Sequence, residues 1–177
     1  MVGWVALTLG AGLGADEPLQ KIQADALSFQ VPPNWKTERP RSQMRKLQMK
    51  VEPASGDSAP AEIYLTVLAG GGGGLDQNIA RWEGQFADGG KPPKAKVETK
   101  KGKNVAVTRV ELAGTFSGMM GMPGQAKPAP QADTRLLGAI ILAGDTGYFL
   151  KLTGPDKTVA SISKQFDAMI ESISIDQ

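Results

Sequence analysis

The chain has 177 residues, a formal net charge of +2 at pH 7, and neither cysteine nor histidine. The two missing residue types exclude disulfides, thiolate nucleophiles, Ser-His-Asp triads, imidazole acid–base catalysis and the usual zinc sites. The net charge is too small to indicate nucleic-acid binding, so carboxylates, lysines, tyrosines and serines remain as candidates for chemistry.

The first residues predict a signal peptide over 1–15. They are apolar, carry no charge before Asp16 and end in small residues, and the stretch is too short to span a bilayer. No Lys or Arg precedes the apolar run, which leaves two alternatives: a start further upstream, or a buried N-terminal strand. We expect residues 16–177 to form a single α+β domain outside the cytoplasm, periplasmic or secreted.

Alternation of apolar and polar residues predicts three strands in the first third of that domain. The first covers 27–31, before Pro32 and Pro33. The segments 45–51 and 61–69 alternate in the same way and are separated by the turn-forming sequence EPASGDSAP, so they predict a hairpin.

Five consecutive glycines, 70–74, precede an apolar stripe of Leu75, Ile79, Trp82 and Phe86 with helical spacing. A phosphate loop needs Lys and Ser or Thr after its last glycine, but here Leu75, Asp76 and Gln77 follow. An aspartate at the helix start would also repel an anion. The glycines therefore predict a flexible link between strand and helix.

The second half of the chain predicts four strands and a closing helix. Residues 95–112 form two strands joined across Lys101-Gly102-Lys103, and residues 134–154 form a central hairpin. Between them, residues 113–133 predict a long loop rich in Gly, Pro, Ala and Met. Apolar positions on one side of 156–175 indicate a helix. This order predicts an antiparallel sheet of hairpins with helices packed on it.

Two groups of residues are candidates for a site. Met119, Met120 and Met122 could hold a soft metal such as Cu(I), although we expect them to fill apolar space instead. The basic stretches 36–50 and 91–103 would form a positive patch if they were adjacent in the sheet, but a solvated face is the simpler interpretation. From the second stretch we select the four lysines Lys96, Lys100, Lys101 and Lys103 as a possible interaction surface.

The order of four segments resembles the PsbP-like family, named for the extrinsic oxygen-evolution protein of photosystem II. The segments are LSFQVPPNW, NIARWEGQF, LLGAIILAGDTGYFLKLTGP and FDAMIESI, and the similarity covers residues 26–175. The resemblance implies an α/β/α sandwich around a curved antiparallel sheet, a fold shared with a Ran-binding nuclear import factor. It also implies an accessory or binding role in an exported protein, and supplies no functional motif whose residues could be transferred.

These observations predict a non-catalytic, extracytoplasmic accessory or binding domain. We expect no cofactor, no nucleic-acid partner, and a monomer that binds a protein or another envelope component. The alternative is a small enzyme that uses carboxylates or lysines in a cleft. A pocket holding two or more titratable groups with shifted pKa values would favour that alternative.

Overall fold

The structure is a computed structural model that describes residues 18–118 and 129–176. The predicted signal peptide over residues 1–15, the methionines Met119, Met120 and Met122, and residues 123–128 of the predicted loop lie outside the described residues. In chain order the elements are β1 (Gln20–Ala24), β2 (Leu27–Val31), β3 (Lys36–Glu38), β4 (Arg45–Val51), β5 (Ala61–Ala69), η1 (Gly70–Gly73), α1 (Leu75–Glu83), β6 (Phe86–Ala87), β7 (Lys96–Lys101), β8 (Ala106–Phe116), β9 (Gln131–Ala143), β10 (Thr146–Pro155), α2 (Asp156–Ser161), α3 (Ser163–Ser172) and β11 (Ser174–Ile175).

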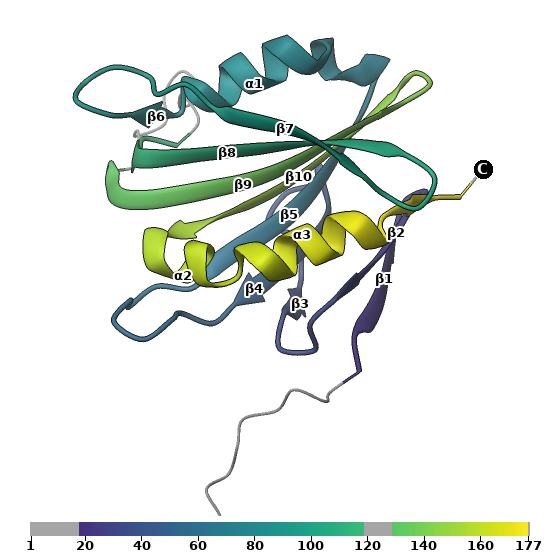
Figure 1. Ribbon diagram of the computed structural model, residues 1–177, viewed down its shortest axis with the longest axis horizontal. Helices are drawn as coiled ribbons and strands as arrows, with labels where there is room; N and C mark the ends of the chain where they lie inside the picture. The colour runs from purple at the N-terminus through teal and green to yellow at the C-terminus, as the bar shows by residue number, and fades with distance from the viewer. Residues whose placement is uncertain (1–17, 119–128, 177) are drawn as a thin grey trace, which may run out of the picture.

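Most of the described strands belong to one eight-stranded antiparallel sheet (Figure 1). Its order is β3-β4-β5-β10-β9-β8-β6, and β7 also pairs with β8. A smaller sheet has the order β1-β2-β11. The three predicted hairpins are confirmed, because β4 pairs with β5, β7 with β8, and β9 with β10. The predicted α+β class with an antiparallel sheet is therefore confirmed.

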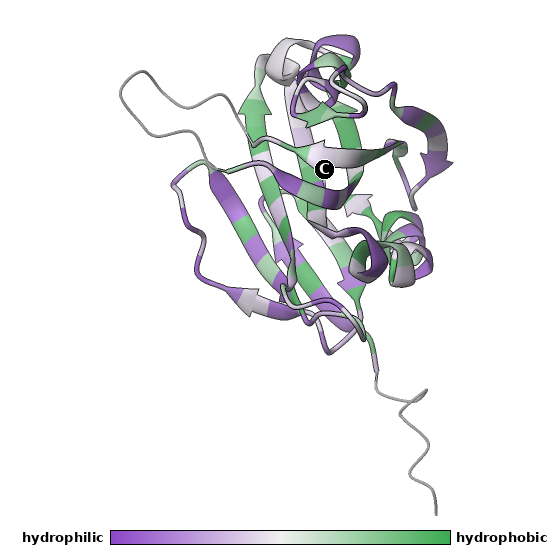
Figure 2. Cartoon of the chain, turned by 90° about the vertical axis from the view of Figure 1, so that its left-hand side faces the viewer, coloured by the Kyte–Doolittle hydropathy of each residue, from purple (hydrophilic) through white to green (hydrophobic). Residues whose placement is uncertain are grey.

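Helices lie on both sides of the large sheet (Figure 1). Trp82 of α1 packs on one face, which we call the α1 face, in a cluster whose buried strand residues include Val110, Leu136, Ile140 and Phe149. The opposite face, the α3 face, is covered by α2, α3 and the small sheet. Figure 2 shows apolar and polar residues alternating along the strands, as a sheet with different environments on its two faces requires.

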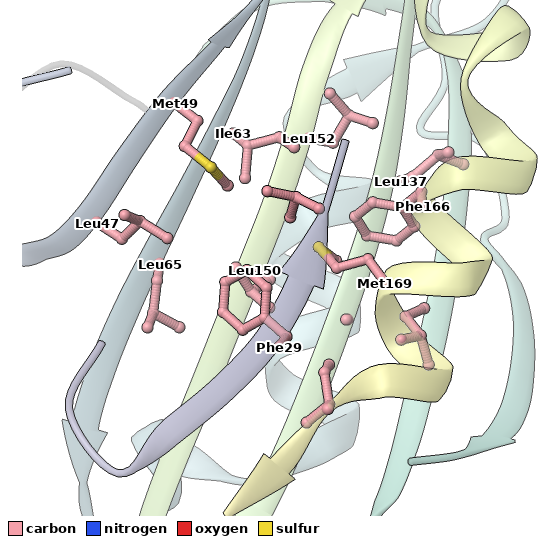
Figure 3. Packing of buried hydrophobic residues seen from close by; sticks show 14 of the residues in the cluster. Phe29, Leu47, Met49, Ile63, Leu65, Leu137, Leu150, Leu152, Phe166 and Met169 are labelled. Atoms are coloured by element: carbon pink, nitrogen blue, oxygen red, sulfur yellow. The ribbon is translucent and has the colours of Figure 1, made fainter. Parts of the chain in front are cut away.

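The larger core fills the space between the α3 face and its covering layer. Phe29 from β2 and Phe166 and Met169 from α3 pack over strand residues such as Leu137 and Leu150 (Figure 3). All five side chains are at most 1% exposed. Trp82 is 4% and Phe166 is 0% exposed, so both are core residues as the helical stripes predict.

Several predicted limits are wrong. The loop predicted over 113–133 is shorter at both ends, because β8 runs to Phe116 and β9 starts at Gln131. The closing helix predicted over 156–175 ends at Ser172, and Ser174–Ile175 form β11. The helix predicted through Phe86 ends at Glu83, and Phe86 instead starts β6, where it pairs with Phe116 at a ring-centroid distance of 5.1 Å. The closing helix is divided at Ile162, whose φ of −106° and ψ of 9° are not helical. The Ser161 hydroxyl donates to the Thr158 carbonyl at 2.7 Å, a local bond that competes with the helix ladder.

The five glycines form an ordered turn, which corrects the prediction of a flexible link. All five have φ between 62° and 95°, in the left-handed region that side chains other than glycine rarely adopt. The Asn78 side-chain amide donates to the carbonyls of Gly72 and Gly74 at 3.1 and 2.6 Å. Glycine is therefore required here by backbone geometry, and the turn is fastened to α1 by Asn78.

Candidate functional site

A row of polar side chains crosses the α1 face through paired positions of neighbouring strands. Directly opposed residues of an antiparallel sheet lie on the same face. The row is Glu38 on β3, Gln48 on β4, Tyr64 on β5 and Lys151 on β10, and it continues into Gly138 on β9 and Val110 on β8. The α1 face is thus polar at the β3 side and apolar where Trp82 covers it.

An open groove lies over the polar part of this face. Its volume is about 1340 Å³. Strand side chains, the loop 56–60, Phe116, Gly118, residues 131–134 and the start of α2 form its walls. We call it the groove; its charged and aromatic lining residues are Glu38, Arg41, Arg45, Lys50, Asp57, Glu62, Tyr64, Phe116, Asp133, Asp156 and Lys157.

Arg45 organises the floor of the groove. Its guanidinium lies 3.9 Å from the centroid of the Tyr64 ring, and its Nη1 donates to Glu62 Oε1 at 3.0 Å and to Gln48 Oε1 at 2.8 Å. Such stacking of a cation on a ring face is favourable. Burial raises the pKa of Tyr64, Arg45 acts in the opposite direction, and Glu62 adds to the increase. Tyr64 is therefore a neutral hydroxyl at physiological pH.

The loop 52–60, whose residues 56–60 line the groove, is fixed to α2. Asp57 Oδ2 accepts from the Thr158 backbone N–H at 2.8 Å and from the Thr158 hydroxyl at 2.6 Å. The hydroxyl oxygen of Thr158 in turn accepts from the Ala54 N–H at 3.0 Å. Asp57 thus provides an acceptor at the start of α2, where helix N–H groups lack partners.

Lys151 is a buried lysine directly opposed to Tyr64, which lines the groove. Its side chain extends from β10 beneath α1, and the residue is only 5% exposed. Nζ donates to Gln85 Oε1 at 2.6 Å and lies 5.2 Å from the Trp82 ring centroid. Burial, with a smaller contribution from the charge of Arg45, lowers the pKa of Lys151 to about 7. Sequence reasoning did not single it out, although it is the one charged residue in the apolar segment GYFLKL.

An ion-pair network on the α3 face joins the sheet to the helices. Buried Arg109 contacts Asp167 at 2.7 Å and Glu111 at 2.9 Å, and Arg135 bridges Glu111 and Asp156. Burial alone would raise the pKa of Glu111, but the hydrogen bonds and charges of Arg109 and Arg135 outweigh it and hold this pKa below its usual value. Every charge in this group has a partner, so we interpret it as structural.

The two basic stretches do not form one patch. Residues 36–50 contain β3 and β4, whereas 91–103 contain β7, at the opposite edge of the sheet. Among the four selected lysines, Lys96 and Lys100 contact Glu98 at 3.0 and 3.6 Å. Lys101 and Lys103 are exposed. A role of the four lysines in binding stays a prediction.

The metal prediction falls on residues that the structure does not describe. Across 18–118 and 129–176, no group of three or more His, Cys, Asp or Glu residues is placed to hold a metal ion. In the same part of the chain, no helix is both long enough and apolar enough to cross a membrane.

Solved structures of other proteins share this fold, and three of them illustrate the match. Cyanobacterial PsbP (CyanoP) from Synechocystis sp. PCC 6803 matches with a TM-score of 0.55 and 11% identity, covering 95% of this chain and 99% of that one. A Pseudomonas aeruginosa protein of unknown function matches with a TM-score of 0.51 and 12% identity, covering 90% and 98%. A Bacteroides thetaiotaomicron structure matches with a TM-score of 0.51 and 10% identity, covering 89% of this chain but 48% of that one.

These likenesses show that the chain has a PsbP-like fold, as its resemblance to that family implies. No family model matches the sequence, and no curated protein matches it. At 10–12% identity the similarity extends to the fold alone.

Proposed function

We propose that this protein is a non-catalytic accessory or binding domain that acts outside the cytoplasm and receives its partner in the groove. The size and openness of the groove carry the proposal. Its volume of about 1340 Å³ exceeds the roughly 300–1,000 Å³ of clefts that enclose small molecules. A groove of this size on an open sheet face suits a segment of a protein or another envelope component.

The arrangement of charge in the groove favours binding over catalysis. Glu62 accepts from Arg45 at 3.0 Å and lies 3.6 Å from Arg41, while Asp57 is held by Thr158 and Asp156 by Arg135. These carboxylates are directed at residues of the wall rather than at a common point where a reacting atom could lie. Tyr64 lines the groove, whereas Lys151 does not.

The proposed location rests on the N-terminal sequence. If residues 1–15 are a signal peptide, the natively expressed protein will lack about 15 residues. Intact-mass measurement of the protein purified from its own cells tests this directly. Recovery from the cytosol with residues 1–15 still attached would overturn the proposed location without affecting the groove.

Capture from the native envelope fraction with two charge-reversal variants tests the binding role. The groove variant is Arg41→Glu with Lys157→Glu, and the matched control is Lys101→Glu with Lys103→Glu. All four side chains are exposed, so neither variant should affect folding, and both change the net charge by the same amount. Equal melting temperatures by circular dichroism would establish that both are folded.

We expect wild type and the control variant to capture the same partner, and the groove variant to lose it. Loss in the control variant alone would assign binding to the lysines near β7 and overturn the groove proposal. Equal capture by all three proteins would also overturn it.

A further inference from the structure

Lys151 has no counter-charge within the described part of the chain. Of its contacts, Gln85 Oε1 is a neutral acceptor and the Trp82 ring offers only its face. No carboxylate in 18–118 or 129–176 forms an ion pair with Lys151. Buried lysines are rarely left in this condition, because an isolated ammonium loses its hydration without compensation.

Two arginines of low exposure do have carboxylate partners. Buried Arg109 is paired with Asp167 and Glu111, and half-buried Arg45 is paired with Glu62. Within residues 18–118 and 129–176, carboxylates thus pair with these two cations but not with Lys151. This contrast suggests that the acid for Lys151 comes from another molecule.

Lys151 does not line the groove, but residues close to it do. Tyr64, its directly opposed neighbour on β5, lines the groove. The backbone carbonyl of Gln85, whose side chain holds Lys151, accepts from the Ser117 N–H at 2.8 Å. Phe116 on one side of Ser117 and Gly118 on the other both line the groove. The groove lining therefore includes the neighbour of Lys151 on β5 and two residues beside the Ser117 that contacts Gln85.

We propose that a carboxylate carried by the partner passes from the groove between Tyr64 and Phe116 to Lys151 and pairs with its ammonium group. This inference rests on the proposed function and names the chemistry that the groove recognises. An ammonium has three N–H donors, of which Gln85 takes one, and the Tyr64 hydroxyl adds an O–H donor at the wall. Arg45 is already engaged by Glu62 and Gln48. This small donor set matches a singly charged carboxylate better than a phosphate.

The binding is coupled to protonation of Lys151. The groups facing it are Arg45 from β4, Tyr64 from β5 and Trp82 from α1, with Gly138 on the β9 side. Because burial brings the pKa of Lys151 to about 7, a large share of the free protein has a neutral amine there at neutral pH. A carboxylate requires the ammonium form, so the complex takes up a proton.

Benzoate is a suitable probe, because it joins one carboxylate to an apolar ring that can enter between two aromatic side chains. NMR titration of the full chain, observing the Lys151 ε-methylene and Tyr64 ring signals, measures its affinity from pH 6 to 9. Benzylamine, which has the same ring and the opposite charge, is the ligand control. Lys151→Met is the protein control, because it keeps an unbranched side chain and removes the charge.

For the wild type we expect affinity for benzoate to decrease about tenfold per pH unit above the pKa of Lys151. We expect Lys151→Met to bind at least tenfold more weakly at pH 6 and without this pH dependence, and benzylamine not to shift the Lys151 signal. Equal affinity of the wild type and Lys151→Met, or pH-independent binding to the wild type, would overturn the proposal.

Capture of the partner by the groove variant and by Lys151→Met distinguishes a failure of this inference from a failure of the proposed function. If the groove variant loses the partner while Lys151→Met keeps it at wild-type affinity at every pH, the groove is the binding site and the carboxylate proposal is wrong. If the groove variant loses the partner and Lys151→Met weakens capture more at pH 6 than at pH 9, the groove proposal and the carboxylate proposal are both supported. Lys151→Met must show a native circular dichroism spectrum, which we expect because a neutral side chain removes the cost of burying a charge.

Discussion

Trp82 lies directly against the backbone of Gly138, the neighbour of Lys151 on β9. A Cβ added to Gly138 would be 2.1 Å from Cζ3 of the Trp82 ring, a distance that packed atoms cannot adopt. Gly138 is thus the position that lets α1 approach the sheet. Because Trp82 also lies over Lys151, the same contact encloses the lysine.

Gly138→Ala should destabilise the protein by overpacking, by roughly 1–3 kcal/mol. Thermal and urea unfolding measure the change. Gly84→Ala is the matched control, because Gly84 is helical and an added Cβ would come no closer than 3.5 Å to another atom. A double-mutant cycle with Trp82→Ala should show coupling, since removal of the ring makes room for the alanine. Strictly additive effects would contradict the contact.

Truncation of the two large helix side chains tests the two cores separately. Trp82→Ala and Phe166→Ala should each cost roughly 3–5 kcal/mol, because each leaves a cavity in a packed interior. Urea unfolding of the purified variants gives both values. If the melting temperature of either variant equalled that of wild type, that side chain would not be a core residue.

The glycine turn offers a comparison between backbone strain alone and strain with a clash. Gly70 and Gly72 have φ of 67° and 62°, but an added Cβ meets nothing within 4 Å at Gly70 and lies 2.9 Å from Leu68 Cδ1 at Gly72. Gly70→Ala should cost roughly 1–2 kcal/mol, the usual penalty of a left-handed residue. Gly72→Ala should cost more. Calorimetric melting of both variants measures the two losses of stability. A larger loss for Gly70→Ala than for Gly72→Ala would mean that the turn is packed differently.

Lys151 should make the free energy of unfolding depend on pH. Its pKa is lowered to about 7 in the folded chain, whereas an unfolded lysine titrates near its ordinary value of 10.5. Between these values the unfolded state holds one more proton, so the free energy of unfolding should rise with pH by roughly 1.4 kcal/mol per unit. Below pH 7 both states are protonated and this contribution is flat.

The difference between wild type and Lys151→Met isolates that contribution, since other groups titrate equally in both proteins. We expect Lys151→Met to be the more stable protein at neutral pH and the two to converge toward pH 10. Urea unfolding at pH 6 to 10 supplies the comparison. A difference that does not change with pH would show that Lys151 keeps its ordinary pKa when folded.

Local pattern was sufficient to predict the hairpins and the two helix stripes. Alternation along one strand, as in Leu47, Met49 and Val51, identifies the buried side without knowledge of its neighbours. The break at Ile162 and the start of β6 at Phe86 could not be read in this way. The break coincides with a bond from the Ser161 hydroxyl to the Thr158 carbonyl, which periodicity does not reveal. The start of β6 depends on pairing with Phe116, thirty residues later.

The candidate site was harder to predict because the pairing of strands brings together residues that are distant in the sequence. Tyr64 and Lys151 are eighty-seven residues apart in the chain and become neighbours only when β5 pairs with β10. Likewise, the basic stretches 36–50 and 91–103 could be placed at opposite edges only from the strand order. The one feature of the sequence that could have marked Lys151 is its place within GYFLKL. A charged residue is rarely buried in a strand that is apolar on both faces.

Site-specific photo-crosslinking in the native envelope tests the central claim, that the groove is the binding surface, most directly. A photoreactive residue at Ser58, which is exposed in the groove, is compared with one at Gln165, exposed on α3, and one at Lys101 on β7. We predict a crosslinked partner from Ser58 and none from the other two positions. Crosslinks from Gln165 or Lys101, with none from Ser58, would contradict the account.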